Sequence, residues 1–407
     1  MNKDHMKKRK GNEGILTIRP VLLILSITHM LTHVCGRIHI AIFPIIRNEF
    51  NLSLRQLGLI AAIPSLCQVL ISIPTGLIID KIGSKKMILA SLCISILGSI
   101  IASQCIDPVM LIIAISLFYI NTTIYHASSY TLITNIFSNR DISKAIGIQD
   151  IGDNFGKAIG PISASILIGF FFLGWRQVYL FWTIPLFIGI IGVISIGNKP
   201  YVKSKENIVK SEYKLQSDSI FTSNFVFFIF FISISAMARQ IVGVFIPIYL
   251  VDHWGLSNNL SSLIYGSSAL MGIVGAPTGG FFASKIGEKK WLLAVLSLAC
   301  ISLGLALAIP NVIVFVILYI FYVFSNTLAM SARSALMAWF SPSRNRGLGY
   351  AFYFLPGSIM GVLAPLFAAN FADIFGLTSI FYVALYINII CLVLLKFGIK
   401  IPVQPSK

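Results

Sequence analysis

The sequence predicts an all-α membrane protein with twelve transmembrane helices in two pseudo-symmetric six-helix bundles. Two observations support this fold class. Of the 407 residues, 57% are hydrophobic and only 11% are charged, against about 25% charged in a soluble domain, and apolar runs of about twenty residues or more recur along the chain. In addition, a motif in the first half of the chain returns about half a chain length later.

The predicted spans follow one another through short connections, except in the middle of the chain. They are expected at residues 19–46, 55–79, 86–104, 108–137, 145–173, 176–196, 223–251, 259–283, 291–309, 311–340, 347–372 and 378–398. The first run follows a basic segment but lacks a small-residue cleavage site, so a removable signal peptide is not expected.

One long polar segment divides the chain. Residues 198–222, which include KSKENIVKSEYKLQSDS, are the expected cytoplasmic linker between the two bundles. The predicted parts are therefore an N-terminal tail, a first bundle, the linker, a second bundle and a C-terminal tail, at residues 1–18, 19–197, 198–222, 223–398 and 399–407.

The basic residues predict the orientation in the membrane. Twelve spans place both termini on one side, and 24 of the 31 Lys and Arg residues fall in the tails and loops of that side; the other side has only Arg47, Arg55 and Arg176. By the positive-inside rule both termini are cytoplasmic, with the plasma membrane as the expected location. The net charge of +17 is spread over short loops, so membrane lipid is the expected partner of this charge and nucleic acid is not.

The repeated motif lies between the second and third spans. The segment PTGLIIDKIGSKKMILASL at 74–92 recurs as PTGGFFASKIGEKKWLLAVL at 277–296. Two parallel six-helix repeats joined by a linker are typical of transporters that bind their substrate near the membrane midplane.

The motif residues Gly76, Asp80, Lys81, Gly83 and Lys85 resemble the signature loop of the major facilitator superfamily. With the repeat and the twelve spans, the resemblance covers nearly the whole chain and implies the major facilitator fold. It also implies that these glycines permit a tight turn where helices pack, and that Asp80 and the lysines latch the cytoplasmic side. The second copy has Ser284 in place of the acid, so a second latch is not expected.

A second pattern lies in the fifth span, where Gly147, Gly156 and Gly160-Pro161 match much of the antiporter motif of this superfamily. Glycines in membrane helices are also close-packing positions, and that reading stays open beside the functional one. The arginine that many proton-coupled drug exporters have in span four is absent from FYINTTIYHASSYTL, which disfavours a proton-driven drug exporter.

Apart from the basic residues at span ends, which are counted above with the tails and loops, six charged residues remain within the predicted spans: Arg37, Asp150, Asp153, Lys157, Arg239 and Arg333. Because each costs about 2.5–3.5 kcal/mol at the bilayer centre, they are expected to face a wet cavity or one another. Lys157 follows Asp153 by one helical turn, so the two can neutralise each other, which leaves a substrate-binding role for Lys157 open. Asp150 and Asp153 are expected to form a gating ion pair with Arg333 of the other half.

Arg37 and Arg239 occupy equivalent points of spans one and seven, and each precedes a proline, Pro44 or Pro247. Two guanidinium groups from pseudo-symmetric helices suit a phosphate, phosphonate or carboxylate group. The pattern is similar to the organophosphate–phosphate antiporter branch, where arginines at these positions bind the substrate phosphate. Much of the chain equally resembles fosmidomycin-resistance-type facilitators, and fosmidomycin is itself a phosphonate.

Histidines accompany Arg37 on one stripe of the first span, because His29, His33 and Arg37 are spaced by four residues. Histidine changes charge near neutral pH, so His33, or His126 in span four, is a candidate for binding substrate and coupling protonation to transport. A histidine that only bonds a neighbouring carbonyl is the open alternative. No acid or third ligand stands nearby in sequence, so no metal site is predicted. Tyr125 is a candidate hydrogen-bond donor to the substrate.

The sequence thus predicts a secondary active transporter of a small organic anion that works by alternating access. A proton or phosphate is the expected counter-ion, and the protein is expected to be a monomer. No enzyme constellation and no Walker loop are found, so neither catalysis nor a cofactor is expected. Two alternatives stay open: a proton-coupled exporter of amphiphilic drugs or metabolites, and a transporter homologue that senses an anion without moving it.

Overall fold

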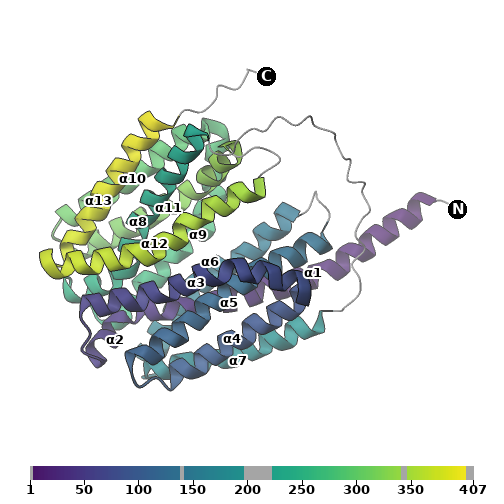
Figure 1. The fold of residues 1–407 in the computed structure, drawn as a ribbon, viewed down its shortest axis with the longest axis horizontal. Helices are drawn as coiled ribbons and strands as arrows, with labels where there is room; N and C mark the ends of the chain where they lie inside the picture. The colour runs from purple at the N-terminus through teal and green to yellow at the C-terminus, as the bar shows by residue number, and fades with distance from the viewer. Residues whose placement is uncertain (1–2, 138–141, 197–221, 341–345, 400–407) are drawn as a thin grey trace. The chain divides into compact units, whose positions relative to one another are not determined.

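The computed structural model describes residues 3–137, 142–196, 222–340 and 346–399, and a helix matches every predicted span (Figure 1). The helices of the first half are α1 (Lys3–Ala41), α2 (Phe43–Glu49), α3 (Leu54–Ile82), α4 (Ser84–Ser103), α5 (Pro108–Ile136), α6 (Ile142–Gly169) and α7 (Trp175–Ser195). Those of the second half are α8 (Ser223–Asp252), α9 (Asn258–Ile286), α10 (Glu288–Ala308), α11 (Val312–Phe340), α12 (Arg346–Phe375), α13 (Leu377–Val393) and the π-helix η2 (Leu394–Gly398).

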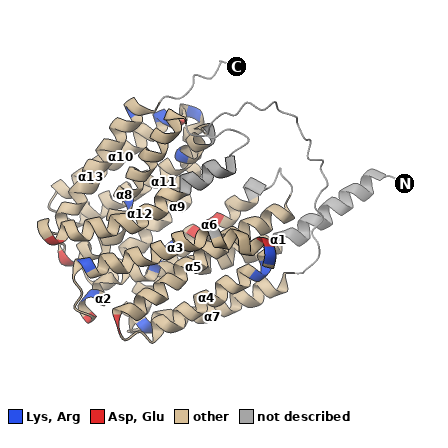
Figure 2. Ribbon diagram, in the orientation of Figure 1, with Lys and Arg blue, Asp and Glu red and all other residues tan. Residues whose placement is uncertain are grey.

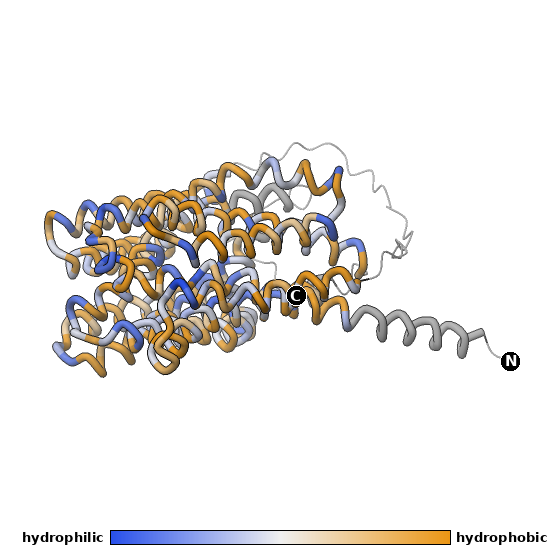
Figure 3. Tube along the Cα trace, turned by 90° about the horizontal axis from the view of Figure 1, so that it is seen from below, coloured by the Kyte–Doolittle hydropathy of each residue, from blue (hydrophilic) through white to orange (hydrophobic). Residues whose placement is uncertain are grey.

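Eleven of these helices are long and apolar enough to cross a membrane, and long hydrophobic stretches are plain along them (Figure 3). The remaining predicted span, α6, is 28 residues long, but Asp150, Asp153 and Lys157 interrupt its apolar sequence. Elsewhere the charged residues of the described part lie mostly near helix ends (Figure 2). The polar residues of α6 therefore need partners inside the protein.

One stripe of α7 exposes large apolar side chains. Ile184, Phe187, Ile188 and Ile191 recur at helical spacing and are all more than half exposed. Large apolar side chains on one helix face are expected where the protein meets lipid tails.

By their contacts the residues form two units. Unit 1 is Met1–His39 with Leu70–Glu212, and unit 2 is Ile40–Val69 with Tyr213–Lys407. The segment 40–69, which belongs to the first repeat by sequence, thus packs with the second. Of the predicted linker 198–222, all but Thr222 lies outside the described residues, as do residues 1–2 and 400–407 of the predicted tails.

The first predicted span is broken near its end. Helix α1 stops at Ala41, and α2 begins with Pro44 in its first turn, where the missing proline N–H costs no hydrogen bond. The Ser262 hydroxyl donates to the Ala41 carbonyl at the break (2.9 Å). In the second repeat the matching Pro247 lies inside an unbroken α8, so the two repeats differ at this point.

The motif loops confirm the internal repeat in three dimensions. Gly83 and Gly287 both adopt a positive φ, +93° and +94°, which favours glycine because it has no Cβ. Gly83 thus makes the predicted turn. Gly76, in contrast, lies within α3 and makes no turn, and a Cβ there would meet none of the described residues within 4 Å. Its part in the latch stays a prediction.

The lysine after each of these glycines caps another helix of the same unit. The Lys85 ammonium donates to the Ile194 and Ile196 carbonyls at the end of α7. The Lys289 ammonium donates in the same way to the carbonyls of Lys396 and Ile399 at the end of η2. A cation at a helix C-terminus satisfies orphan carbonyls and favours the helix dipole. Lys85 therefore has a structural role within unit 1, whatever latch it also forms.

Replacing Lys85 by methionine is expected to destabilise the protein by about 1 kcal/mol, because it removes the charge from the end of α7 and keeps the apolar stem. Melting of the purified protein in detergent measures this. Lys86→Met is the matched control, since Lys86 is exposed. Equal melting of the two variants would contradict the capping role.

Candidate functional site

Close packing of α6 on α1 builds the first cluster of polar residues in unit 1. A Cβ at Gly152, Gly156 or Gly160 would lie 2.1, 2.3 or 2.4 Å from the carbonyl oxygen of Ser26, Met30 or Val34, respectively. Only glycine permits this approach of two helix backbones, so Gly156 and Gly160 of the motif, and Gly152 beside them, are packing positions. At Gly147, by contrast, an added Cβ would meet no part of the described chain within 4 Å. The contact places Asp153 of α6 against the histidines of α1.

Three histidines meet there, two from α1 and one from α5. The Nε2 atom of His126 lies 3.1 Å from Nε2 of His33 and 3.5 Å from Nε2 of His29. The nitrogen ligand atoms of the three residues lie within 4.8 Å of one another. Sequence reasoning placed His29 and His33 on one stripe but had no signal that His126, on another helix, would join them.

Neighbouring groups hold these rings. His29 Nδ1 is 3.0 Å from the Gln149 carbonyl oxygen, and a carbonyl only accepts, so Nδ1 carries a proton. The Tyr125 ring stacks on His29 at a centroid distance of 5.4 Å. The Tyr125 hydroxyl donates to the Leu25 carbonyl (2.7 Å) and meets Thr28 Oγ1 at the same distance. Tyr125 was predicted as a substrate ligand. In the structure its hydroxyl forms hydrogen bonds from α5 to α1.

The two aspartates of α6 have different partners. Lys157 donates to Asp153 Oδ2 (2.6 Å), as the spacing predicted, and Asp153 Oδ1 lies 2.9 Å from His33 Nε2. Asp150 Oδ1 accepts from the Tyr130 hydroxyl (2.9 Å). Asp153, Lys157, His29, His33 and His126 therefore form one connected set, which we call the histidine cluster.

A second polar cluster lies in unit 2, between α8 and α11. Arg239 Nη1 donates to Ser235 Oγ (2.6 Å), and Arg333 Nη2 donates to the same oxygen (3.2 Å). Arg333 Nη2 also reaches Asn326 Oδ1 at 3.4 Å. We call these four residues the arginine pair cluster. Sequence reasoning named both arginines but assigned them to different tasks, and only the packing of α8 on α11 joins them.

The remaining predicted residues belong to neither cluster as defined above. Arg37 is half-buried one turn after His33 in α1, and Asp80 and Lys81 are exposed at the end of α3. The predicted gating pair of Arg333 with Asp150 and Asp153 would join residues of the two units, and it stays a prediction, as does the latch of the motif loop.

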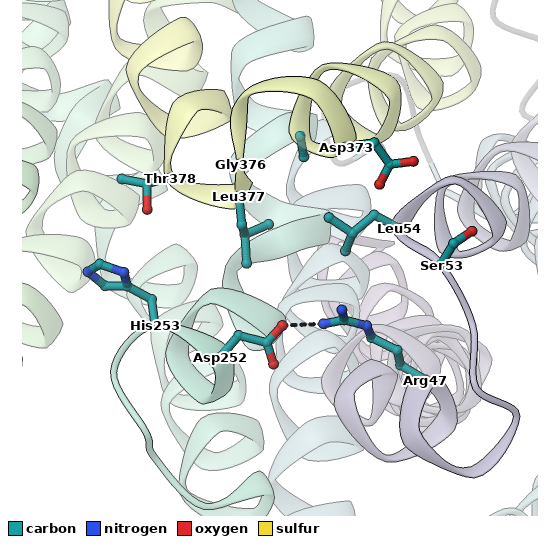
Figure 4. Close-up of a pocket in the computed structure, with 10 residues that line it drawn as sticks. Arg47, Ser53, Leu54, Asp252, His253, Asp373, Gly376, Leu377 and Thr378 are labelled. Carbon is teal, nitrogen blue, oxygen red and sulfur yellow. Dashed lines mark hydrogen bonds and ion pairs between the residues drawn. The ribbon is translucent and has the colours of Figure 1, made fainter.

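A pocket of about 520 Å³ lies among helix ends of unit 2 (Figure 4). Arg47 forms an ion pair with Asp252 beside it, and Arg55 pairs with Asp373 at 2.9 Å. The sequence showed the two arginines only as outer-side charges, because their partners lie far away along the chain. These ion pairs join α2 and α3 to α8 and α12 within unit 2 and lie outside both polar clusters.

A family model described as Major Facilitator Superfamily matches residues 25–237 and 226–407. The chain belongs to this superfamily. The predicted family, all-α fold and multi-pass membrane character are thereby confirmed.

Curated relatives are distant. The probable nitrate transporter NarT of Staphylococcus epidermidis is 25% identical over 258 residues, which cover 62% of this chain and 63% of the relative. The hexuronate transporter of Bacillus subtilis is 25% identical over 290 residues, 66% of this chain and 65% of the relative. The fosmidomycin resistance protein of Escherichia coli is 24% identical over 148 residues, 36% of each chain. The chain thus spans less than two thirds of the length of each of these relatives.

Solved structures share the fold. A bacterial homologue of the human lysosomal transporter Spinster, inward-facing and occupied, has a TM-score of 0.78 at 16% identity, with 93% of this chain and 96% of that chain covered. A D-xylose–proton symporter has a TM-score of 0.77 at 13% identity, with 94% and 98% covered. At such identities the likeness concerns the fold alone.

Proposed function

We propose that this protein is a secondary active transporter of a small anion, and that the arginine pair cluster of unit 2 binds the anion. The main support is the convergence of Arg239 and Arg333 on one oxygen, Ser235 Oγ. Two guanidinium groups held together inside a helix bundle repel each other, and an anion that both groups contact offsets that repulsion. The forked donors of arginine suit a carboxylate, phosphate, phosphonate or nitrate.

The names of the relatives support the same substrate charge. Relatives of this chain are named for transport of nitrate and hexuronate or extrusion of nitrite, all of which are anions at neutral pH. A phosphate- or phosphonate-bearing substrate is the narrower form of the proposal. It rests on the resemblance to the organophosphate antiporter and fosmidomycin-resistance branches.

Arg37 is the proposed second anion ligand. Its support is the sequence repeat, in which Arg37 and Arg239 occupy equivalent positions of the first and seventh predicted spans. In transporters built from such repeats, corresponding helices of both halves contribute to one substrate site. Arg37→Ala therefore belongs in the same experiment as Arg239→Ala.

Anion counterflow in proteoliposomes tests the proposal. Vesicles are loaded in turn with phosphate, a sugar phosphate, a phosphonate, a hexuronate or nitrate, and exchange of the labelled anion is measured. We expect the wild type to exchange at least one class and Arg239→Ala to lose more than about 90% of the rate, since losing a charged hydrogen-bond partner costs about 1.5–3 kcal/mol.

Arg55→Ala is the matched control, because Arg55 is 58% exposed in a peripheral ion pair and should keep its exchange rate. Failure of the wild type to exchange any of these anions, together with movement of a lipophilic cation down a pH gradient, would favour the exporter of amphiphilic compounds. Saturable anion binding without exchange would favour the anion sensor.

The proposed counter-ion is a proton, with phosphate as the other candidate, and His33 and His126 are the proposed coupling residues. The charge distribution of the loops supports a plasma-membrane protein with both termini cytoplasmic. A monomer is the proposed state of the protein. The same vesicles report coupling when a pH gradient is imposed. Membrane-impermeant labelling of a cysteine added at either terminus reports orientation in whole cells.

A further inference from the structure

In the histidine cluster, three neutral imidazole rings cannot satisfy all the close contacts between their nitrogens and Asp153. His29 carries its proton on Nδ1, against the Gln149 carbonyl, so a neutral His29 has only a lone pair at Nε2. His33 Nε2 lies 2.9 Å from Asp153 Oδ1 and 3.1 Å from His126 Nε2. If this nitrogen carries a proton, it can donate that proton to only one of the two atoms. If it carries none, its lone pair faces the carboxylate oxygen with no proton between them. In either case at least one of these close contacts has no proton.

One added cation at the meeting point removes this conflict. A single proton joins only two of the atoms, whereas a metal ion takes the lone pairs of all three nitrogens and a carboxylate oxygen at once. The sequence predicted no metal because no third ligand stands near His29 and His33. The structure supplies His126 from α5 and Asp153 from α6, so that premise does not hold.

We propose that His29, His33, His126 and Asp153 bind a divalent first-row transition-metal ion of the zinc type. With metal–nitrogen bonds of about 2.0–2.1 Å, a tetrahedral ion separates its nitrogen ligands by about 3.3 Å. The two Nε2 separations at His126 are 3.1 and 3.5 Å. Three imidazoles and one carboxylate suit zinc and its neighbours better than they suit magnesium or calcium.

One oxygen of the Asp153 carboxylate is available to bind such an ion. Its Oδ2 accepts from Lys157, while Oδ1 is buried and accepts no hydrogen bond of good geometry from the described residues, although His33 Nε2 is 2.9 Å away. Lys157 repels a metal ion, and its ion pair with Asp153 moderates that repulsion.

The groups behind the ligands resemble the outer partners that metal-binding histidines have in general. Such a histidine usually donates its second ring N–H to a carbonyl or carboxylate, which aims the other nitrogen at the metal. His29 meets this condition through Gln149, and its ring is stacked on Tyr125. Both contacts lie within unit 1, so this proposal does not depend on the anion site of unit 2. A bound metal ion would take the lone pairs of His33 and His126, so in this proposal it stands in place of the coupling proton at these two residues.

Metal titration of the full-length protein tests the site. Protein purified in detergent and stripped with a chelator is titrated with Co²⁺, whose visible absorption reports tetrahedral coordination, and then with competing Zn²⁺. We expect one equivalent per chain. His126→Ala and His33→Ala should weaken the Kd by at least about tenfold, the lower end for removing even an outer partner.

Three further variants make the test specific. His126→Cys keeps a metal ligand and should retain Zn²⁺ binding, provided that it elutes as a single species like the wild type. His253→Ala, which changes an exposed histidine, should bind as the wild type does. Arg239→Ala should lose anion exchange and keep metal binding, which separates failure of this proposal from failure of the proposed function.

The proposal is overturned if wild-type protein takes up no stoichiometric metal ion, which would mean that the cluster holds a proton only. It is also overturned if His126→Ala and the wild type bind equally, or if His253→Ala abolishes binding, which would indicate adventitious surface binding.

Discussion

Gly156→Ala is expected to lower the stability of the protein by about 1–3 kcal/mol, the usual cost of overpacking. A Cβ at residue 156 would lie 2.3 Å from the Met30 carbonyl oxygen and 2.8 Å from the His33 Cβ. Both are backbone or backbone-proximal atoms, so α6 must move away from α1. That movement also separates Asp153 from His33, and we expect metal binding to weaken together with stability.

The matched control for this change lies on the same helix. Among the described residues, nothing lies within 4 Å of a Cβ added at Gly147, and alanine is favoured over glycine in a helix by about 1 kcal/mol. Gly147→Ala should therefore keep or raise the melting temperature, whereas Gly156→Ala lowers it. The melting temperatures of both variants are measured in detergent by fluorescence-detected size exclusion. The same sign of change for both would show that α6 does not pack on α1 through its glycines.

Asp153→Asn is expected to destabilise the protein by about 2 kcal/mol. Breaking a fully buried ion pair costs about 3–5 kcal/mol, and the cost is smaller here because the Lys157 side chain is 32% exposed. In this variant the Lys157 ammonium stays near three imidazoles but has lost the Asp153 carboxylate that neutralised its charge. We expect a lower yield of folded protein and a lower melting temperature, measured on membranes from matched cultures.

The double variant Asp153→Asn/Lys157→Met separates the charge from the shape. It removes both charges and keeps similar volumes, so most of the lost stability should return, since replacing a buried pair by neutral groups is often nearly neutral. It should still bind metal more weakly than the wild type. If the double variant is as unstable as Asp153→Asn alone, the pair does not act through charge neutralisation.

The helices were predictable because a membrane leaves the backbone few choices. Every polar group of the main chain must be satisfied within the segment, so a long apolar run becomes a helix. Twelve predicted spans therefore each have a helix in the structure. Pro44 shows the limit of this reasoning. The first helix ends at Ala41, shortly before Pro44, whereas the equivalent Pro247 leaves α8 unbroken.

The polar residues show a different limit. Spacing along one helix predicted the ion pair of Lys157 with Asp153 and the stripe that contains His29 and His33, because side chains four residues apart share a helix face. It could not predict that His126 would face them from α5. It also gave no sign that Arg333 of α11 would meet Arg239 of α8 at Ser235.

The sequence by itself determined the fold family, the repeated halves and the residues whose charge needs an explanation within the membrane. These are local or periodic properties, and their energies depend on one helix and its solvent. Only the tertiary structure decided which polar groups share a site. Such contacts depend on how closely two helix backbones approach, as at Gly152, Gly156 and Gly160, and on residues about a hundred positions apart in the chain. The packing of α5 against α1 adds His126 to His29 and His33, and this completes the three-histidine cluster.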